Sequence, residues 1–216
     1  RAAEESRRIL MVGFNRRYAP LHQRARELWD GRPVGFCVLE KHRDSAYHLD
    51  LYSNYIDDTV HIIDLLRFFC GEPTPLRTAA HVKDGKLVRA TAFLEVDGTG
   101  QAVVATELNA GSWQERYALH GGGASLYVDA FSELRFIDEN GQRVEKETYA
   151  SAWTSTLKGR GFEDEIAHFL TCVREGGTPR SPLADSTVYR YRVRAANRVG
   201  AISQPSEIVE IATPPP

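Results

Sequence analysis

The sequence is poor in cysteine, with three in 216 residues and no Cys-x-x-Cys pair. Cys37, Cys70 and Cys172 are odd in number and far apart, which argues against both a disulfide framework and a structural zinc site. Such cysteine usage is typical of a reducing compartment. We therefore expect the protein to be cytoplasmic.

The sequence also lacks long apolar runs and an excess of charge of one sign. No run approaches the roughly 20 residues that a membrane-spanning helix needs, and the start carries no signal peptide. The net charge of −2 gives no reason to expect nucleic acid or an anionic membrane as a partner. The first residues, Arg1 to Ser6, lack methionine and look like the middle of a helix. We therefore expect a fragment of a longer protein.

Hydrophobic periodicity predicts helices in the first third of the chain and strands in the middle. We expect the end of a polar helix at 1–8, a strand at 9–14 and a helix at 21–29 that Pro20 opens. A strand at 34–40, a polar and aromatic loop at 41–56 and a helix at 57–70 follow. Seven short strands, expected at 76–82, 87–96, 102–108, 115–119, 125–129, 134–137 and 144–149, are separated by hairpin turn sequences such as Asp84-Gly85.

One more amphipathic helix is expected at 162–175, and its proposed inner face consists of Phe162, Ile166, Phe169, Leu170 and Val173. Strands that follow one another without intervening helices pair mostly antiparallel. The predicted fold class is therefore α+β: a large open, mostly antiparallel β-sheet with helices packed on one face.

The most informative residues are Asp57, His61 and Asp64, which share one face of the helix predicted at 57–70. An imidazole beside carboxylates on a largely apolar helix is costly unless these groups find partners. The residues alone leave three interpretations open: an acid–base pair, a helix cap with a core histidine bonded to a carbonyl, or a divalent metal site. We favour no metal, because no fourth ligand at a helpful spacing appears.

The loop before this helix combines aromatic and hydrogen-bonding side chains, a mixture that suits a sugar or a cyclitol. The candidates for substrate binding are Lys41, Tyr47, His48 and Tyr55, with Asp64 from the helix. An ordinary exposed loop whose tyrosines cover the sheet edge is the alternative.

Three motifs resemble the glucose–fructose oxidoreductase, inositol dehydrogenase and rhizopine-catabolism (Gfo/Idh/MocA) family. They are Phe-Asn-Arg-Arg-Tyr-Ala-Pro at 14–20, Asp57-x-x-x-His61-x-x-Asp64, and Gly-Ala-Ser-Leu-Tyr-Val-Asp at 123–129. They occur in the family's order over residues 1 to about 185. One departure is that residues 52–56 replace the glycine-rich segment that leads into the family's helix.

The resemblance implies a catalytic half of an NAD(P)-dependent oxidoreductase, with His61 as the acid–base group and Asp57 as its partner. It places Asn15, Arg16 and Arg17 toward the cofactor, although a surface salt bridge is an equal alternative for Arg16. NAD or NADP would be bound mainly by an N-terminal domain absent from this sequence, together with a Glu-Lys-Pro segment and its catalytic lysine. The open sheet would carry the substrate pocket and a homo-oligomer interface.

The expected organisation is therefore a helix–strand remnant of a dinucleotide-binding domain at 1–14, the sheet domain at 15–185 and a tail at 186–216. The alternating Tyr189-x-Tyr191-x-Val193 pattern and a second strand at 208–211 resemble the end of a fibronectin type III domain. Two strands cannot enclose a sandwich core. The alternative function is a non-catalytic binding or oligomerisation module that uses the sheet and this tail.

Overall fold

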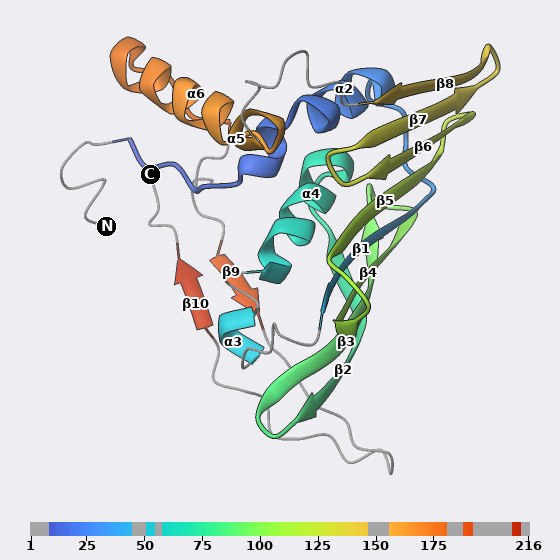
Figure 1. Cartoon of the computed structure of the whole chain (residues 1–216), viewed down its shortest axis with the longest axis vertical. Helices are drawn as coiled ribbons and strands as arrows, with labels where there is room; N and C mark the ends of the chain where they lie inside the picture. Colours follow the sequence, from blue (N-terminus) through green and yellow to red (C-terminus); the bar gives the residue numbers. More distant parts are fainter. Residues whose placement is uncertain are drawn as a thin grey trace.

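An eight-stranded sheet forms the body of the protein (Figure 1). The computed structural model describes residues 9–44, 51–54, 58–146, 156–180, 188–191 and 209–212. The strands are β1 (Phe36–Asp44), β2 (Thr74–Lys83), β3 (Lys86–Val96), β4 (Gly100–Ala110), β5 (Gln114–Gly121), β6 (Ala124–Asp129), β7 (Glu133–Asp138) and β8 (Gly141–Lys146).

The strand order is β2-β3-β4-β1-β5-β6-β7-β8, and every neighbouring pair is antiparallel except β1 and β4. The predicted α+β class and mostly antiparallel sheet are thus confirmed. Asp84 and Gly85, which join β2 to β3, both have positive φ, at 52° and 74°. This is the backbone that a tight hairpin turn requires, and Asp-Gly adopts it readily.

Strand β1 sits in the middle of the sheet and is longer than predicted. Cys37, Leu39 and Lys41 alternate along it and are fully buried. The strand continues to Asp44, so the loop predicted from Lys41 starts too early. The reason is that strand pairing with β4 and β5 continues through charged residues, which a hydrophobicity pattern does not register as strand.

Helices α2 (Pro20–Trp29) and α4 (Val60–Cys70) lie on one face of the sheet (Figure 1). Pro20 opens α2, as predicted, because a proline at the first helical position sacrifices no hydrogen bond. Gly71 ends α4 with a φ of 75°, a conformation that favours glycine. The remaining helices are the 3₁₀ helix η1 (Asn15–Tyr18), α3 (Leu51–Asn54), α5 (Thr156–Gly159) and α6 (Phe162–Glu175).

The strand predicted at 9–14 does not form in the described part of the chain. A strand needs a neighbouring strand to bond its backbone groups. Here the amide of Phe14 instead donates a hydrogen bond to the carbonyl of Val12, at 2.9 Å, within a local turn. Nothing in the described residues tests the origin proposed for 1–14, and residues 1–8 lie outside them. The described helices include none that is long and apolar enough to cross a membrane.

Helix α6 occupies its predicted range, but the inner face proposed for it is wrong. Phe162, Ile166, Leu170 and Val173 are between 38% and 58% exposed, whereas Glu165 and Cys172 are buried. Figure 1 shows why: α6 projects beside η1 and α5, away from the sheet. Periodicity identifies an apolar stripe but not the element that covers it.

Two strands of the tail, β9 (Val188–Tyr191) and β10 (Val209–Ala212), pair with each other as a separate antiparallel sheet. Both strands were predicted. Their pairing leaves the fibronectin resemblance of residues 186–216 untested, because most of that segment lies outside the described residues.

Two leucines on different helices give a matched test of this packing. Leu65 on α4 is fully buried in the main core, and Leu170 on α6 is 52% exposed. We expect Leu65→Ala to lower the free energy of unfolding by about 2–5 kcal/mol, because it leaves a cavity. Leu170→Ala should change it by no more than about 0.5 kcal/mol. Urea unfolding measures both, and equal losses would contradict the assigned packing.

Candidate functional site

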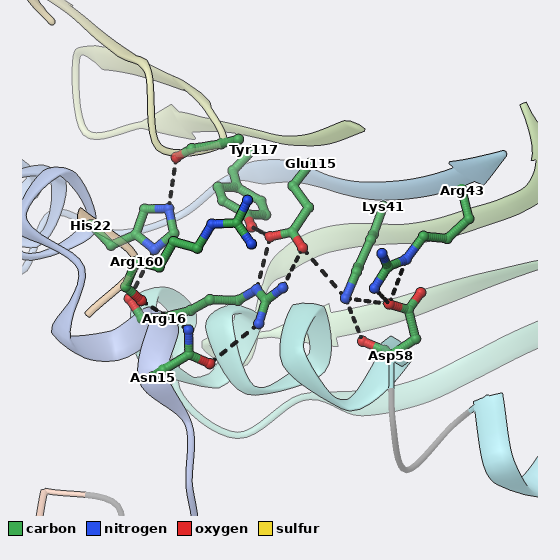
Figure 2. A network of polar contacts seen from close by, with 10 residues as sticks. Asn15, Arg16, His22, Lys41, Arg43, Asp58, Glu115, Tyr117 and Arg160 are labelled. Atoms are coloured by element: carbon green, nitrogen blue, oxygen red, sulfur yellow. Dashed lines mark hydrogen bonds and ion pairs between the residues drawn. The ribbon is translucent and has the colours of Figure 1, made fainter. Parts of the chain in front are cut away.

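A chain of buried ion pairs lies between the sheet and the helices (Figure 2). It begins with Lys41 on β1 and Glu115 on β5, which are directly opposite each other in the antiparallel pairing. Strand alternation turns both inward, and their side chains are 1% and 0% exposed. The Lys41 Nζ lies 3.4 Å from the Glu115 Oε1. Two opposite charges are therefore buried side by side.

Arg16 brings a second cation to Glu115 from η1. Its Nε and Nη2 donate to the two carboxylate oxygens at 2.8 and 2.5 Å, and the Tyr117 hydroxyl donates at 2.7 Å. Burial alone would raise the pKa of Glu115, but the hydrogen bonds and charge of Arg16, together with the Lys41 charge, hold that pKa well below its usual range. The surface salt bridge considered for Arg16 is wrong, since this pair is buried.

Asp58 completes the network at the start of α4. The Lys41 Nζ lies 2.5 Å from the Asp58 Oδ1 and donates to the Asp58 backbone carbonyl at 3.1 Å. Arg43, two residues further along β1, donates its Nε to the same Oδ1 at 2.9 Å. Burial and Arg16 lower the pKa of Lys41, while Glu115 and Asp58 oppose that shift. The Asp58 Oδ2 is buried without a hydrogen-bond partner among the described residues.

His61 follows Asp58 by one helical turn and is partly buried. Burial, and then the positive charges of Arg16 and Lys41, lower its pKa to about 3, against the weaker opposing effect of Glu115 and Asp58. This pKa lies well below the usual value of a histidine, which is about 6.5. The imidazole is neutral at neutral pH, and its buried Nδ1 has no hydrogen-bond partner in the described structure. A neutral ring with a vacant nitrogen can accept a proton or a hydrogen bond.

Asp64, one turn further along the same helix, pairs with Arg17. The Arg17 Nε and Nη2 each donate to one Asp64 oxygen at 2.7 Å. Burial raises the pKa of Asp64, and Arg17 opposes that rise. This bidentate pair joins η1 to α4, so Arg16 and Arg17 hold two different carboxylates.

The 3₁₀ helix that carries both arginines is itself held by polar contacts. The Asn15 Nδ2 donates to the carbonyl of Arg160 at 2.8 Å, and the Asn15 Oδ1 accepts from Arg16 at 3.3 Å. Gly161 permits this approach, because a Cβ there would lie 2.2 Å from the Asn15 carbonyl oxygen. The His22 ring contacts the carbonyl oxygens of Arg16 and Ala130 (Figure 2).

Of the predicted site residues, the structure brings Arg16, Lys41 and His61 together around Asp58 and Glu115. Asp57, Tyr47, His48 and Tyr55 lie outside the described residues. Among the described residues there is no group of three His, Cys, Asp or Glu side chains suited to a metal ion.

Asp58 and Glu115 were missed as site residues. Every second residue of β5 from Glu115 to Leu119 is buried, so Glu115 shares one face of the strand with Tyr117 and Leu119. That alternation was a usable signal of an inward-facing carboxylate. For Asp58 we find no comparable signal in the sequence.

Comparison with known proteins adds to this geometry. No protein-family model matches the sequence. YceM of Salmonella typhimurium, whose name assigns it to the oxidoreductases, is 30% identical over 206 residues, which are 94% of this chain. A dehydrogenase (MviM) from Clostridium difficile shares the fold with a TM-score of 0.73 and 21% identity, and the match covers 83% of this chain. A Gfo/Idh/MocA family oxidoreductase from Vibrio cholerae superposes with a TM-score of 0.65 and 21% identity over 82% of this chain.

The chain thus shares its fold with a Gfo/Idh/MocA family oxidoreductase, the family that its motifs resemble. It spans 64% of the length of YceM, 58% of the Clostridium difficile chain and 57% of the Vibrio cholerae chain. This partial coverage agrees with the predicted correspondence to the family's sheet-bearing C-terminal domain.

A further titratable group lies beside the Arg17–Asp64 pair. Glu165 on α6 is 7% exposed, and its Oε1 has no hydrogen-bond partner among the described residues. Burial, and then the negative charge of Asp64, raise its pKa to about 7. This carboxyl group is therefore protonated in the folded protein below neutral pH.

We expect Glu165 to make the folded protein less stable as the pH rises. An unfolded glutamate ionises near 4.5, whereas folded Glu165 ionises near 7. The contribution of Glu165 to stability should therefore fall between about pH 4.5 and 7, by on the order of 1–3 kcal/mol, and level off above. Urea unfolding of the wild type and of Glu165→Gln at several pH values measures this contribution as the difference between the two proteins, in which the opposing titration of His22 and His61 cancels.

Glu163→Gln, at an exposed position on the same helix, is the matched control and should keep the wild-type dependence. A Glu165→Gln variant with an unchanged pH profile would show that another group causes the fall.

Proposed function

We propose that this chain is the substrate-binding and proton-transfer half of a nicotinamide-dependent oxidoreductase that acts on a sugar, a cyclitol or a related polyol. The observation that carries the proposal is His61: a neutral imidazole with an unpartnered, buried Nδ1, next to a fixed network of charges, on the helix where the family resemblance places the acid–base group. These surroundings favour a functional histidine over a structural core histidine whose ring nitrogens are both hydrogen-bonded.

Oxidation of a secondary alcohol needs a base for the hydroxyl proton while hydride leaves the same carbon. His61 would accept that proton, and Asp57 would orient the ring. For efficient transfer the bound substrate and cofactor would have to raise the low pKa of His61. A bound nicotinamide cofactor would supply the hydride acceptor. The cofactor site would also include three residues of η1, namely Asn15, Arg16 and Arg17. One of them, Arg16, belongs to the charged network around His61.

The names of two solved structures with this fold support the substrate and cofactor class. An Agrobacterium radiobacter oxidoreductase was solved with NAD⁺, L-tartaric acid and magnesium, at 16% identity and a TM-score of 0.66. A structure from Acidithiobacillus ferrooxidans is named UDP-N-acetylglucosamine 3-dehydrogenase, at 19% identity and a TM-score of 0.64. At such identities the likeness itself concerns the fold, so the transfer of this chemistry to our chain is part of the proposal.

The substrate-binding roles of Tyr47, His48, Tyr55 and Asp64 remain predictions. Asp64 contacts Arg17 with both carboxylate oxygens, so a contact with substrate would have to share or displace that pair. The choice between NAD and NADP would depend on the dinucleotide-binding domain.

The deciding measurement is therefore the rate of turnover by a protein expressed together with the coding sequence upstream of Arg1. We expect that sequence to encode a strand, a glycine-rich turn and a Glu-Lys-Pro segment. Cofactor reduction on a panel of polyols should fall by about 10²- to 10⁴-fold in His61→Gln, because the proton acceptor is lost.

His81→Gln is the matched control, since His81 is exposed on β2, and it should retain wild-type turnover. Equal rates for His61→Gln and the wild type would rule out the acid–base role. An upstream sequence without those elements would rule out the enzyme for this gene.

We also propose that the sheet face opposite the helices forms a homo-oligomer interface. A depression of about 290 Å³ on this face is lined by alternating charges, among them Glu40, Arg116 and Arg135. Arg135 lies 4.5 Å over the ring of Tyr127. Arg135→Glu should weaken association by reversing one charge, and sedimentation over a range of concentrations measures it. A monomeric wild-type protein would contradict the interface.

A further inference from the structure

Helix α4 is attached to strand β1 at both of its ends. At the carboxyl end, the Cys70 Sγ lies 3.7 Å from the Cys37 Sγ in the core. At the amino end, Asp58 meets Lys41, four residues further along the strand. The first attachment is a contact between two buried thiols, and the second is an ion pair. The polar attachment lies at the end of the helix that carries His61.

Two contacts connect Lys41 to the start of this helix, and both of them are with Asp58. Its Nζ contacts the Asp58 carboxylate at 2.5 Å and the Asp58 backbone carbonyl at 3.1 Å (Figure 2). The lysine side chain is only 1% exposed. We propose that Lys41 is a positioning residue, not a substrate ligand: it fixes the first turn of α4, and thereby the His61 ring, against β1. The functional meaning of this inference rests on the proton-transfer role proposed for His61.

The backbone contact is what distinguishes positioning from simple charge pairing. Residues 58 and 59 form a π-type turn that leads into α4, so the Asp58 carbonyl belongs to the path of the helix backbone. Asp58 precedes His61 by three residues, which places both on one helical face. A displacement of Asp58 therefore moves the ring of His61.

The charges around His61 make this arrangement measurable. Arg16 and Lys41 repel a protonated imidazole, and Glu115 and Asp58 attract it. Removal of the Lys41 charge should therefore raise the proton affinity of His61. Removal of the Asp58 charge should not raise it. A loss of structure alone would admit water and raise it in both variants.

Lys41→Met should still fold, because each carboxylate keeps an arginine. Arg43 remains bonded to Asp58, and Arg16 remains bonded to Glu115. Asp58→Asn preserves the shape of the side chain and serves as the second variant. Lys146→Met is the matched control: Lys146 is also a strand lysine paired with a glutamate, at 3.2 Å from Glu133, but it is 68% exposed.

The experiment follows the histidine ring signals by NMR as a function of pH in this same chain, with the His61 signal assigned by its absence in His61→Gln. In the wild type, His61 should stay neutral to about pH 4, because its pKa is about 3. In Lys41→Met its midpoint should rise by about one pH unit or more, a tenfold gain in proton affinity. In Asp58→Asn and Lys146→Met it should not rise.

Amide hydrogen exchange tests the positioning directly. The amides of the first turn of α4 should exchange at least about tenfold faster in Lys41→Met, while those near Cys70 keep the wild-type rate. An unchanged midpoint or unchanged exchange in Lys41→Met would overturn the inference, as would an equal rise of the midpoint in Asp58→Asn. Neither measurement uses turnover, so a failure of the proposed catalytic role remains distinguishable from a failure of the positioning role.

Discussion

The structure depends on a pair of opposite charges buried next to each other on one face of a sheet. Lys41 and Glu115 are opposite residues of β1 and β5, and buried ions are tolerated only when further groups compensate them. Arg16 and Asp58 provide that compensation from η1 and from the start of α4. Four separate segments of the chain are thereby joined, and each must keep its place for the others to remain neutralised.

This arrangement gives α4 two parts with different physical tasks. Its residues Ile62, Leu65 and Leu66 are fully buried in the apolar core, which anchors the helix without specifying an exact orientation. The charged contacts at its amino end are directional. His61 therefore belongs to a helix that apolar packing anchors and that ion pairs fix at its start. That combination suits a group whose task is to move a proton.

Much of the fold could be predicted locally. Alternation and turn sequences located the strands from β2 to β8, Pro20 opened α2, and the Asp57-x-x-x-His61 spacing placed the candidate histidine on a helix. These features succeed because they depend on backbone conformations that a few neighbouring residues determine. The site was predicted less completely. His61, Lys41 and Arg16 were identified, but their shared partners Asp58 and Glu115 were not.

The sequence by itself thus determined the class of fold, the family resemblance and the helix that carries His61. The tertiary structure decided which charges meet, since Lys41 faces Glu115 only through the pairing of strands far apart in the chain. It also decided that the apolar stripe of α6 is exposed, because periodicity marks a face without naming what packs on it. Local pattern specifies which way a side chain points, and only the assembled sheet and helices determine what it meets there.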